Sequence, residues 1–470
     1  MRLAIACVLA AQAGAPSSTT SDLDAPEVVD RFVAHAIAWI DEKPDASLAL
    51  VREAFSDEMK AALSEKSIES TLALARDSGE VRASIIDAQR SDAHRSWTFL
   101  LEQEHTRWLS IVSLDASQHV SGWWLKRAPR RVARAELVRE FEALQGDWGL
   151  SATLYDAEHA RVDGVELEHG RSFLPLGSIF KLYVLAELAR SVDAGERTLE
   201  DELVVDEKRK SLPSGELQNA VAGTKVKLRD AARAMIRISD NTAADHLLFL
   251  LGREKVEAGL ARCFLSEPAR MQPFLSTLEM FAAKSLTKAQ NARVFGKEKL
   301  DDLAVAWRDA SIEERRAWLA KLDQLLAEGD PKKSRDAFGM RFGLTTLGAK
   351  RHLEIEWFAK PRDVVALVAA AERGELHSAG ASKLFLEFYA AGAPLYPMPG
   401  VVAQGYKGGS EPGVFALSTR VVLADGRSVV ACLVRSGFDA MDTKVPDRTV
   451  GLLIDCIGNL IEGDPVAAEK

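Results

Sequence analysis

The spacing of apolar residues changes from a helical period to strand-like alternation in the N-terminal part of the chain. From about residue 26 to residue 75, apolar residues recur at helical spacing, as Val29, Phe32 and Ile40 do, which predicts successive helices. Segments rich in Trp, Val, Ile and Leu follow and predict strands over Ser96–Leu101, Thr106–Leu114 and Val120–Lys126. Helices followed by a run of antiparallel strands indicate a small α+β domain, which we place at residues 26–128.

A second, longer part of the chain has strands near both of its ends and helices between them. Leu137, Phe141 and Leu144 share one face of a helix expected over residues 131–145, so residues 129–140 hold a linker and the start of this helix. The strand candidates are Gly149–Tyr155, Gly164–Phe173, Val401–Tyr406, Val414–Leu423 and Ser428–Val434, and an amphipathic helix is expected over Thr449–Ile461. The pattern predicts one antiparallel sheet, completed by distant segments around a helical subdomain, in a domain spanning residues 141–463.

The first residues have the character of an export signal. Met1-Arg2 precedes the apolar run Leu3–Ala11, and Ala11-Gln12-Ala13 resembles a small-residue cleavage site. We therefore expect residues 1–18 to be a signal peptide and the protein to be exported to the periplasm or the extracellular space. No later apolar run approaches the roughly 20 residues that cross a bilayer, so we expect no membrane span.

Composition narrows the range of partners and cofactors. The formal net charge of −9 and the pI near 5.7 give no broad positive surface for phosphates, which argues against a nucleic acid partner. The nine histidines do not cluster at ligand spacings, so the sequence predicts no metal site. Cys263, Cys432 and Cys456 remain once the expected signal peptide is removed, and their number and wide spacing define no disulfide framework. The pattern indicates no particular oligomeric state.

Lys181 lies in a segment whose other residues are mostly apolar. The segment Pro175–Leu188 opens with turn residues and continues as an almost wholly apolar helix, which must be buried. A buried ammonium is costly unless it is paired, and a lowered pKa relieves this cost by leaving an amine that can accept a proton. Ser178 precedes Lys181 by three residues and so shares its helix face. The pair predicts a nucleophilic Ser178 activated by Lys181, with the helix N-terminus adding positive potential for an oxyanion.

The order of three short motifs distinguishes this pair from a chance Ser-x-x-Lys. Ser285-Leu286-Thr287-Lys288 is such a chance copy, because a chain of this length contains about one. Ser178-x-x-Lys181, in contrast, is followed by Ser239-Asp240-Asn241 and then by Lys407-Gly408-Gly409-Ser410. The set resembles the S-x-x-K, S-D-N and K-T-G motifs of class A β-lactamases and penicillin-binding proteins. The 61 residues from Ser178 to Ser239 agree with the roughly sixty usual in class A.

The resemblance implies a role for each matching residue. Ser239 would relay protons to the leaving group, and Asn241 would position both the substrate and Lys181. Lys407 would supply positive charge to a substrate carboxylate, and Gly408 and Gly409 would allow the substrate to approach the strand edge. The backbone N–H groups of Ser410 and Ser178 would form the oxyanion hole. Asp240 precedes a helix in which Thr242 and Asp245 are expected to form a capping box.

Three departures from the family pattern bear on activity. Gly408 replaces the hydroxyl residue of K-T-G, so we expect only the Ser410 side chain to supply the lost hydrogen bond. The 168 residues from Ser239 to Lys407 exceed the roughly one hundred of class A enzymes, which indicates a helical insertion at about residues 279–341 that could form a lid or an arm. The expected position of the deacylating glutamate falls near Ala349-Lys350. Glu354 and Glu356 are off register and are interpreted as solvated loop residues, which predicts inefficient lactam hydrolysis.

The domain order and the segment Ser211–Leu217 resemble one subfamily in particular. It is typified by the cephalosporin-esterase-like protein of clavulanic acid clusters and by related mycobacterial lipoproteins. The resemblance implies a domain of nuclear-transport-factor-2 or steroid-isomerase-like fold, followed by a β-lactamase-like domain with a five-stranded antiparallel sheet and a helical subdomain. It also implies a serine hydrolase that needs no cofactor and forms an acyl-enzyme with a small-molecule β-lactam or ester. A cell-wall DD-peptidase, or a non-catalytic binding or scaffold protein with a degenerate catalytic domain, is the alternative.

Overall fold

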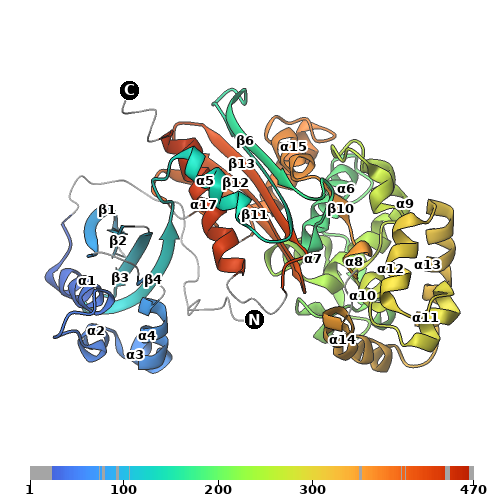
Figure 1. Cartoon of the computed structure of the whole chain (residues 1–470), viewed down its shortest axis with the longest axis horizontal. Coiled ribbons are helices and arrows are strands. Elements are labelled where there is room, and N and C mark those ends of the chain that lie inside the picture. Colours follow the sequence, from blue (N-terminus) through green and yellow to red (C-terminus); the bar gives the residue numbers. More distant parts are fainter. Residues whose placement is uncertain are drawn as a thin grey trace. The chain divides into compact units, whose positions relative to one another are not determined.

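A computed structural model describes residues 24–73, 75–76, 80–90, 95–104, 106–348, 352–392, 394–396, 398–439 and 445–464. The expected signal peptide, residues 1–18, lies outside these ranges. The chain divides into two compact units (Figure 1). The first contains the described residues up to Val132 together with Tyr396–Gly400, and the second contains Ala133–Leu395 and the described residues from Val401 onward. No helix within these ranges is both long and apolar enough to cross a bilayer.

The first unit consists of short helices followed by one antiparallel sheet. The helices are α1 (Glu27–Ile40), α2 (Leu48–Glu53), α3 (Asp57–Ala62) and α4 (Glu65–Ala73). The strands β1 (Arg82–Arg90), β2 (Arg95–Glu102), β3 (Arg107–Leu114) and β4 (Val120–Ala128) pair in chain order. Aromatic side chains fill the core, where Phe32 lies edge-on to Trp123 with ring centroids 5.5 Å apart. The α+β architecture of this unit is as predicted, whereas its likeness to nuclear transport factor 2 stays a prediction.

The sheet of the second unit is built from strands at both ends of the unit. It has five strands in the order β11-β12-β13-β5-β6, and every neighbouring pair is antiparallel. Their bounds are β5 (Asp147–Tyr155), β6 (Arg161–His169), β11 (Val401–Glu411), β12 (Val414–Leu423) and β13 (Ser428–Ser436). All nine residues of β13 are buried, because helices cover both faces of this central strand. The predicted five-stranded antiparallel sheet is thus confirmed.

The helices of the second unit pack against the sheet and against one another. Helices α5 (Arg134–Glu142) and α17 (Val445–Glu462) pack against each other, and α15 (Pro361–Glu372) and α17 both contact β13. Of the remaining helices, η1 (Gly177–Phe180) and α16 (Ala379–Tyr389) contact the sheet, and α6 (Lys181–Asp193), α7 (Leu228–Arg237), α8 (Asn241–Leu251) and α9 (Arg253–Gly259) pack with one another. Two short ladders complete the unit: β7 (Leu174–Pro175) with β10 (Phe358–Ala359), and β8 (Glu202–Val204) with β9 (Lys225–Lys227).

The expected insertion is part of the helical layer of this unit. Its helices are α10 (Thr277–Ala283), α11 (Lys288–Phe295), α12 (Leu300–Asp309), α13 (Ile312–Ala327) and α14 (Pro331–Gly348). Apolar side chains from them, including Met280, Trp307 and Phe338, belong to the same buried cluster as residues of α6 and β13. These side chains anchor the insertion to the core of the unit, and its role as a lid or an arm over the site stays a prediction.

Candidate active site

Ser178 and Lys181 lie at the junction of η1 and α6, beside the edge strand β11. Ser178 is half-buried in η1, and Lys181 is the first residue of α6. The chain enters this turn through Gly177, whose φ of +48° is readily adopted only by glycine. The rings of Phe180 and Trp357 stack with centroids 3.8 Å apart. These contacts fix the turn that carries the serine.

The Lys181 amine is fully buried and hydrogen-bonds to Ser239 and Asn241, the two predicted site residues of the second motif. Its Nζ lies 2.6 Å from the Ser239 backbone oxygen, 2.6 Å from Asn241 Oδ1, 3.0 Å from Ser239 Oγ and 3.2 Å from Ser178 Oγ. Burial lowers the pKa of Lys181 from 10.5 to about 7, although the carboxylates of Asp245 and Asp240 oppose this shift. A neutral amine has two N–H bonds for the two nearest acceptors and one lone pair for a hydroxyl. Lys181 is therefore suited to accept a proton from Ser178 or Ser239.

Ser239 is held in a strained conformation by the segment that precedes α7. Its φ is +56°, which is uncommon for a residue other than glycine and marks functional sites. The Ser214 hydroxyl donates to the Ser239 backbone oxygen at 2.7 Å, and the Asn241 backbone N–H donates to the Ser214 oxygen at 3.0 Å. The Asn241 Nδ2 donates to the Leu212 oxygen at 3.0 Å, which directs Oδ1 toward Lys181. The segment Ser211–Leu217 thus positions the second motif.

Asp240, rather than Thr242, caps helix α8. One oxygen of the Asp240 carboxylate accepts from Ala243 N at 2.8 Å, and the other accepts from Glu216 N and Leu217 N. The predicted capping box of Thr242 and Asp245 is wrong, because the chain is already helical at Asn241. The Asp245 carboxylate accepts instead from two backbone N–H groups at the start of α10, at 2.7 and 2.9 Å.

Lys407 and Gly409 come from the edge strand β11, whose outer side faces the serine. Lys407 is 2% exposed, and its Nζ lies 3.0 Å from Ser239 Oγ and 2.6 Å from the Gly408 oxygen. Burial and the neighbouring Lys181 hold its pKa well below the ordinary value. A Cβ on Gly409 would lie 2.4 Å from the Leu176 oxygen and 2.5 Å from Ser178 N. The strand can therefore approach the serine this closely only with glycine at this position.

Tyr406 fills the space beside Gly408. A Cβ on Gly408 would lie 2.2 Å from the Tyr406 hydroxyl oxygen, and the two residues share one strand face because they are two positions apart. Burial raises the pKa of Tyr406 to about 12, so the phenol keeps its proton. The expectation that only Ser410 could replace the hydroxyl of K-T-G is therefore wrong. The alternation of side chains along a strand could have identified Tyr406 from the sequence.

Glu354 and Glu356 are both buried, so their interpretation as solvated loop residues is wrong. The Glu354 carboxylate lies 2.8 Å from the Arg171 guanidinium, away from the serine. Glu356 lines a small cavity beside Ser178 together with Glu411. The expected glutamate position near Ala349-Lys350 lies outside the described residues.

Lys284 joins the two carboxylates of this cavity in a buried cluster. Its Nζ lies 3.0 Å from Glu356 and 2.7 Å from Glu411. One ammonium cannot neutralise two carboxylates. Burial, followed by the charge of Glu411, therefore raises the pKa of Glu356 to about 8. Sequence analysis missed this cluster because its members lie far apart in the chain and match no motif.

The second Ser-x-x-Lys copy lacks the surroundings of the first. The Ser285 hydroxyl donates to the Phe281 backbone oxygen at 2.6 Å, and Lys288 is exposed. The structure brings Ser178, Lys181, Ser239, Asn241 and Lys407 together instead. No group of three or more His, Cys, Asp or Glu side chains within the described ranges is arranged to hold a metal ion.

The second unit is similar to a known protein family. Residues 163–391 match the model of the β-lactamase enzyme family, a range that includes Ser178, Lys181, Ser239 and Asn241 and ends before Lys407. Residues 163–391 of the second unit are therefore similar to the β-lactamase enzyme family, as the motif order predicted.

Several solved structures are similar to the chain. A β-lactamase from Sphaerobacter thermophilus is 20% identical, and the match covers 70% of this chain and 97% of that one with a TM-score of 0.45. PBP-A is 15% identical over 71% of this chain and 98% of that one, also with a TM-score of 0.45. A β-lactamase from Chitinophaga pinensis is 17% identical over 69% and 96%, with a TM-score of 0.43. No curated protein matches the sequence.

Proposed function

We propose that this protein forms an acyl-enzyme on Ser178 with β-lactam or ester substrates and then hydrolyses it, which the similarity of residues 163–391 to the β-lactamase enzyme family supports. The observation that carries the proposal is the Lys181 amine, which is fully buried and lies 3.2 Å from Ser178 Oγ. Within the described ranges, none of the hydrogen bonds of this amine is to a carboxylate. An unpaired, buried amine next to a hydroxyl is the arrangement that general-base activation of a serine requires.

Acylation begins when Ser178 Oγ attacks the substrate carbonyl carbon and its proton passes to Lys181 Nζ. The carbonyl oxygen becomes an oxyanion, for which the backbone N–H groups of Ser178 and Ser410 are the proposed donors. The close approach of Gly409 to Ser178 N brings these two donors to one side of the carbonyl. Removing one preorganised donor of this kind lowers the rate about 10²–10³-fold.

Ser239 is the proposed relay of the proton to the leaving group. Its hydroxyl lies 3.0 Å from both Lys181 Nζ and Lys407 Nζ. As the tetrahedral intermediate collapses, Ser239 gives its proton to the departing nitrogen or alkoxide and takes one from Lys181. The neutral amine of Lys181 is thereby restored, and protons balance over the step.

We place the substrate carboxylate at Tyr406 and Ser410. Both residues share the face of β11 on which Gly408 lies, two positions from each. Lys407 is too deeply buried to reach the carboxylate in the conformation described, so we assign it a longer-range electrostatic effect. A phenol with a pKa of about 12 is a hydrogen-bond donor at every physiological pH.

Glu356 is our candidate for the base of deacylation. The cavity that it shares with Ser178 has a volume of about 20 Å³, which is room for about one water molecule. Because burial and the charge of Glu411 raise the pKa of Glu356, less of this carboxyl is ionised at neutral pH than in a solvent-exposed glutamate, and the protonated form cannot accept a proton from water. We therefore expect the penicilloyl-enzyme to persist at pH 7 and to be hydrolysed faster as the pH rises.

Ester turnover is expected to exceed penicillin turnover at neutral pH. The alcohol of a small ester leaves the site and the remaining acyl group is small, so water can approach with help from Lys181. A penicillin remains attached through its opened ring and crowds the same cavity.

Burst kinetics with a penicillin and a small ester, measured from pH 6 to pH 9, test this function. We expect a burst with both substrates and a penicillin steady state that rises between pH 7 and pH 9. Glu356→Gln should abolish that rise. Glu354→Gln is the matched control, because this neighbouring buried carboxyl lies away from the serine, and it should retain the rise. If neither substrate gives a burst or turnover, the protein is not a hydrolase of this class. Fast penicillin hydrolysis at pH 7 that Glu356→Gln abolishes would contradict the slow deacylation.

A further inference from the structure

A second cavity, of about 500 Å³, lies in the same unit. It shares no lining residue with the cavity beside Ser178: Trp357, just before β10, lines the cavity beside Ser178, whereas Phe358, the first residue of β10, lines this one. The volume lies within the range of small-molecule sites, and the proposed acyl transfer does not use it.

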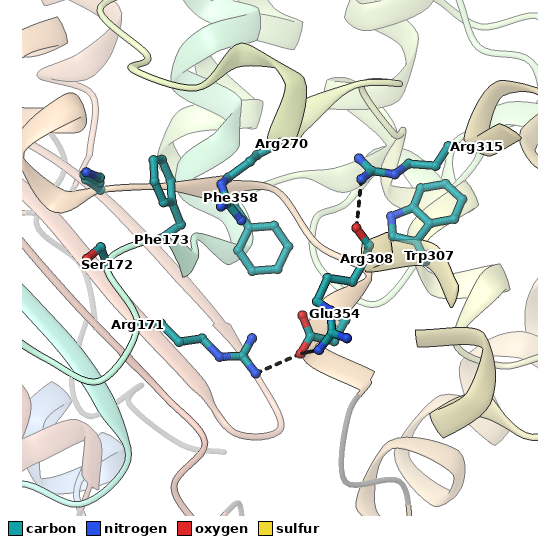
Figure 2. A pocket seen from close by; sticks show the side chains of 10 residues that line it. Arg171, Ser172, Phe173, Arg270, Trp307, Arg308, Arg315, Glu354 and Phe358 are labelled. Atoms are coloured by element: carbon teal, nitrogen blue, oxygen red, sulfur yellow. Dashed lines mark hydrogen bonds and ion pairs between the residues drawn. The ribbon is translucent and has the colours of Figure 1, made fainter. Parts of the chain in front are cut away.

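The charge of this cavity is opposite to that of the protein as a whole. The chain has a formal charge of −9, yet the cavity is lined by five cationic side chains and a single carboxylate, Glu354. The cationic residues are Arg171, Arg270, Arg308, Arg315 and Lys360. Figure 2 shows Arg171 and Arg308 both directed toward Glu354, at 2.8 and 3.9 Å. The Glu354 carboxylate therefore pairs with two of the five cations.

Two of the cations have no carboxylate partner among the described residues. Arg270 and Arg308 pair with Glu267 and Asp309 outside the cavity. Arg315 donates only to three backbone carbonyl oxygens, at 3.2 to 3.4 Å, and its Nε is buried without a partner in the described part of the chain. Lys360 forms no ion pair with a described residue. Arg315 and Lys360 thus bring positive charge to the cavity that no described carboxylate pairs with, and an anionic ligand would pair with this charge.

Aromatic rings form the rest of the wall. The Arg270 guanidinium lies 4.3 Å and the Lys360 amine 4.7 Å from the centroid of the Phe173 ring. Cation–π contacts of this kind hold the two charges in place. Trp307 and Phe358 add apolar surface beside Arg315 and Arg270, as Figure 2 shows.

We propose that this cavity binds an aromatic anion, a flat ring that carries a phosphate or a carboxylate group. The acidic group is bound by Arg315, which has no carboxylate partner among the described residues and lies beside Trp307 (Figure 2). Guanidinium groups form bidentate hydrogen bonds with both phosphate and carboxylate. The ring lies against Phe358 and Trp307, which a small inorganic anion alone would leave uncovered.

Calorimetric titration of the full chain with phenyl phosphate and with benzoate tests the proposal. We expect one binding site, weaker binding of inorganic phosphate and of benzyl alcohol than of the intact probe, and weaker binding at high salt. The probe that binds more tightly, phenyl phosphate or benzoate, shows whether the cavity prefers a phosphate or a carboxylate group. Loss of one charged hydrogen bond should weaken binding about 10-fold or more, so Arg315→Gln should show at least this loss. Arg315→Lys keeps the charge but loses the bidentate contact, so it should show a smaller loss.

Arg362→Gln is the matched control, because Arg362 is exposed, pairs with Glu166 and does not line the cavity. It should bind phenyl phosphate as the wild type does. An unchanged unfolding temperature shows that each variant is folded, and Arg315→Lys alone suffices if Arg315→Gln does not fold. The proposal is overturned if neither probe binds at millimolar concentration, or if a folded Arg315 variant binds as tightly as the wild type. These outcomes do not depend on acylation of Ser178, so the two proposals fail separately.

Discussion

The rate of Ser178 acylation should follow the protonation of Lys181, with an inflection near pH 7. A lysine in water has a pKa near 10.4, so only about 0.04% of it is neutral at pH 7. Burial brings the pKa of Lys181 to about 7, which leaves about half of the amine neutral at that pH. The shift corresponds to about 5 kcal/mol in favour of the neutral form. The neutral fraction of Lys181 at pH 7 is thus about a thousandfold larger than that of a solvent-exposed lysine.

The direction of this pH dependence follows from the role of Lys181 as a base. Only the neutral amine can take the proton of Ser178, so acylation is fastest above pH 7 and is lost as the pH falls. With a pKa of about 7, roughly 1% of the amine is neutral at pH 5 and roughly 99% at pH 9. The acylation rate at pH 5 should therefore be about a hundredfold below the plateau.

Stopped-flow measurement of acylation with a chromogenic ester from pH 5 to pH 9 tests this reasoning. Ser178→Ala gives the uncatalysed background, and the unfolding temperature at each pH shows that the protein stays folded. A profile that is flat over this range, or one that rises only above pH 9, would refute the assignment of Lys181 as the base.

Two further predictions concern the strand that faces the serine. Tyr406→Phe and Ser410→Ala should each raise KM for carboxylate-bearing substrates by about 10-fold, because each loses one charged hydrogen bond, and should leave a neutral ester nearly unaffected. Equal effects on both substrates in steady-state kinetics would show that the carboxylate binds elsewhere. Gly409→Ala should slow acylation by at least about 10²-fold, because its Cβ would displace the strand from Ser178 N. The milder Gly408→Ala, which meets only the end of the Tyr406 side chain, is the comparison, and equal rates in the two variants would contradict the geometry.

Local patterns predicted most of the fold because the elements concerned have clear apolar periods. Strands β5, β12 and β13 are rich in Val, Leu and Ala and were placed to within a few residues. Strand β1 (Arg82–Arg90) was missed, since it is an edge strand of mixed polarity with a bulge between Ile85 and Asp87. Pairing with β2 stabilises β1, and the strand preference of its own residues does not show that this pairing will form.

The candidate site was predictable only where function imposes a fixed local spacing. Ser178 and Lys181 are one helical turn apart, so their contact follows from the sequence. The cluster of Lys284, Glu356 and Glu411 depends on three segments that only the folded chain brings together. The basic cavity was missed for the same reason.

Intact-mass spectrometry after incubation with a penicillin tests the central claim most directly. The wild-type chain should gain the mass of one penicillin molecule, because opening the lactam ring expels no atom, and Ser178→Ala should gain none. The Ser285→Ala variant is the control, since Ser285 belongs to the chance motif and hydrogen-bonds to Phe281, and it should be labelled as the wild type is. An adduct that survives in Ser178→Ala would contradict the assignment of the nucleophile, and a wild-type chain that gains no mass would contradict the proposed reaction.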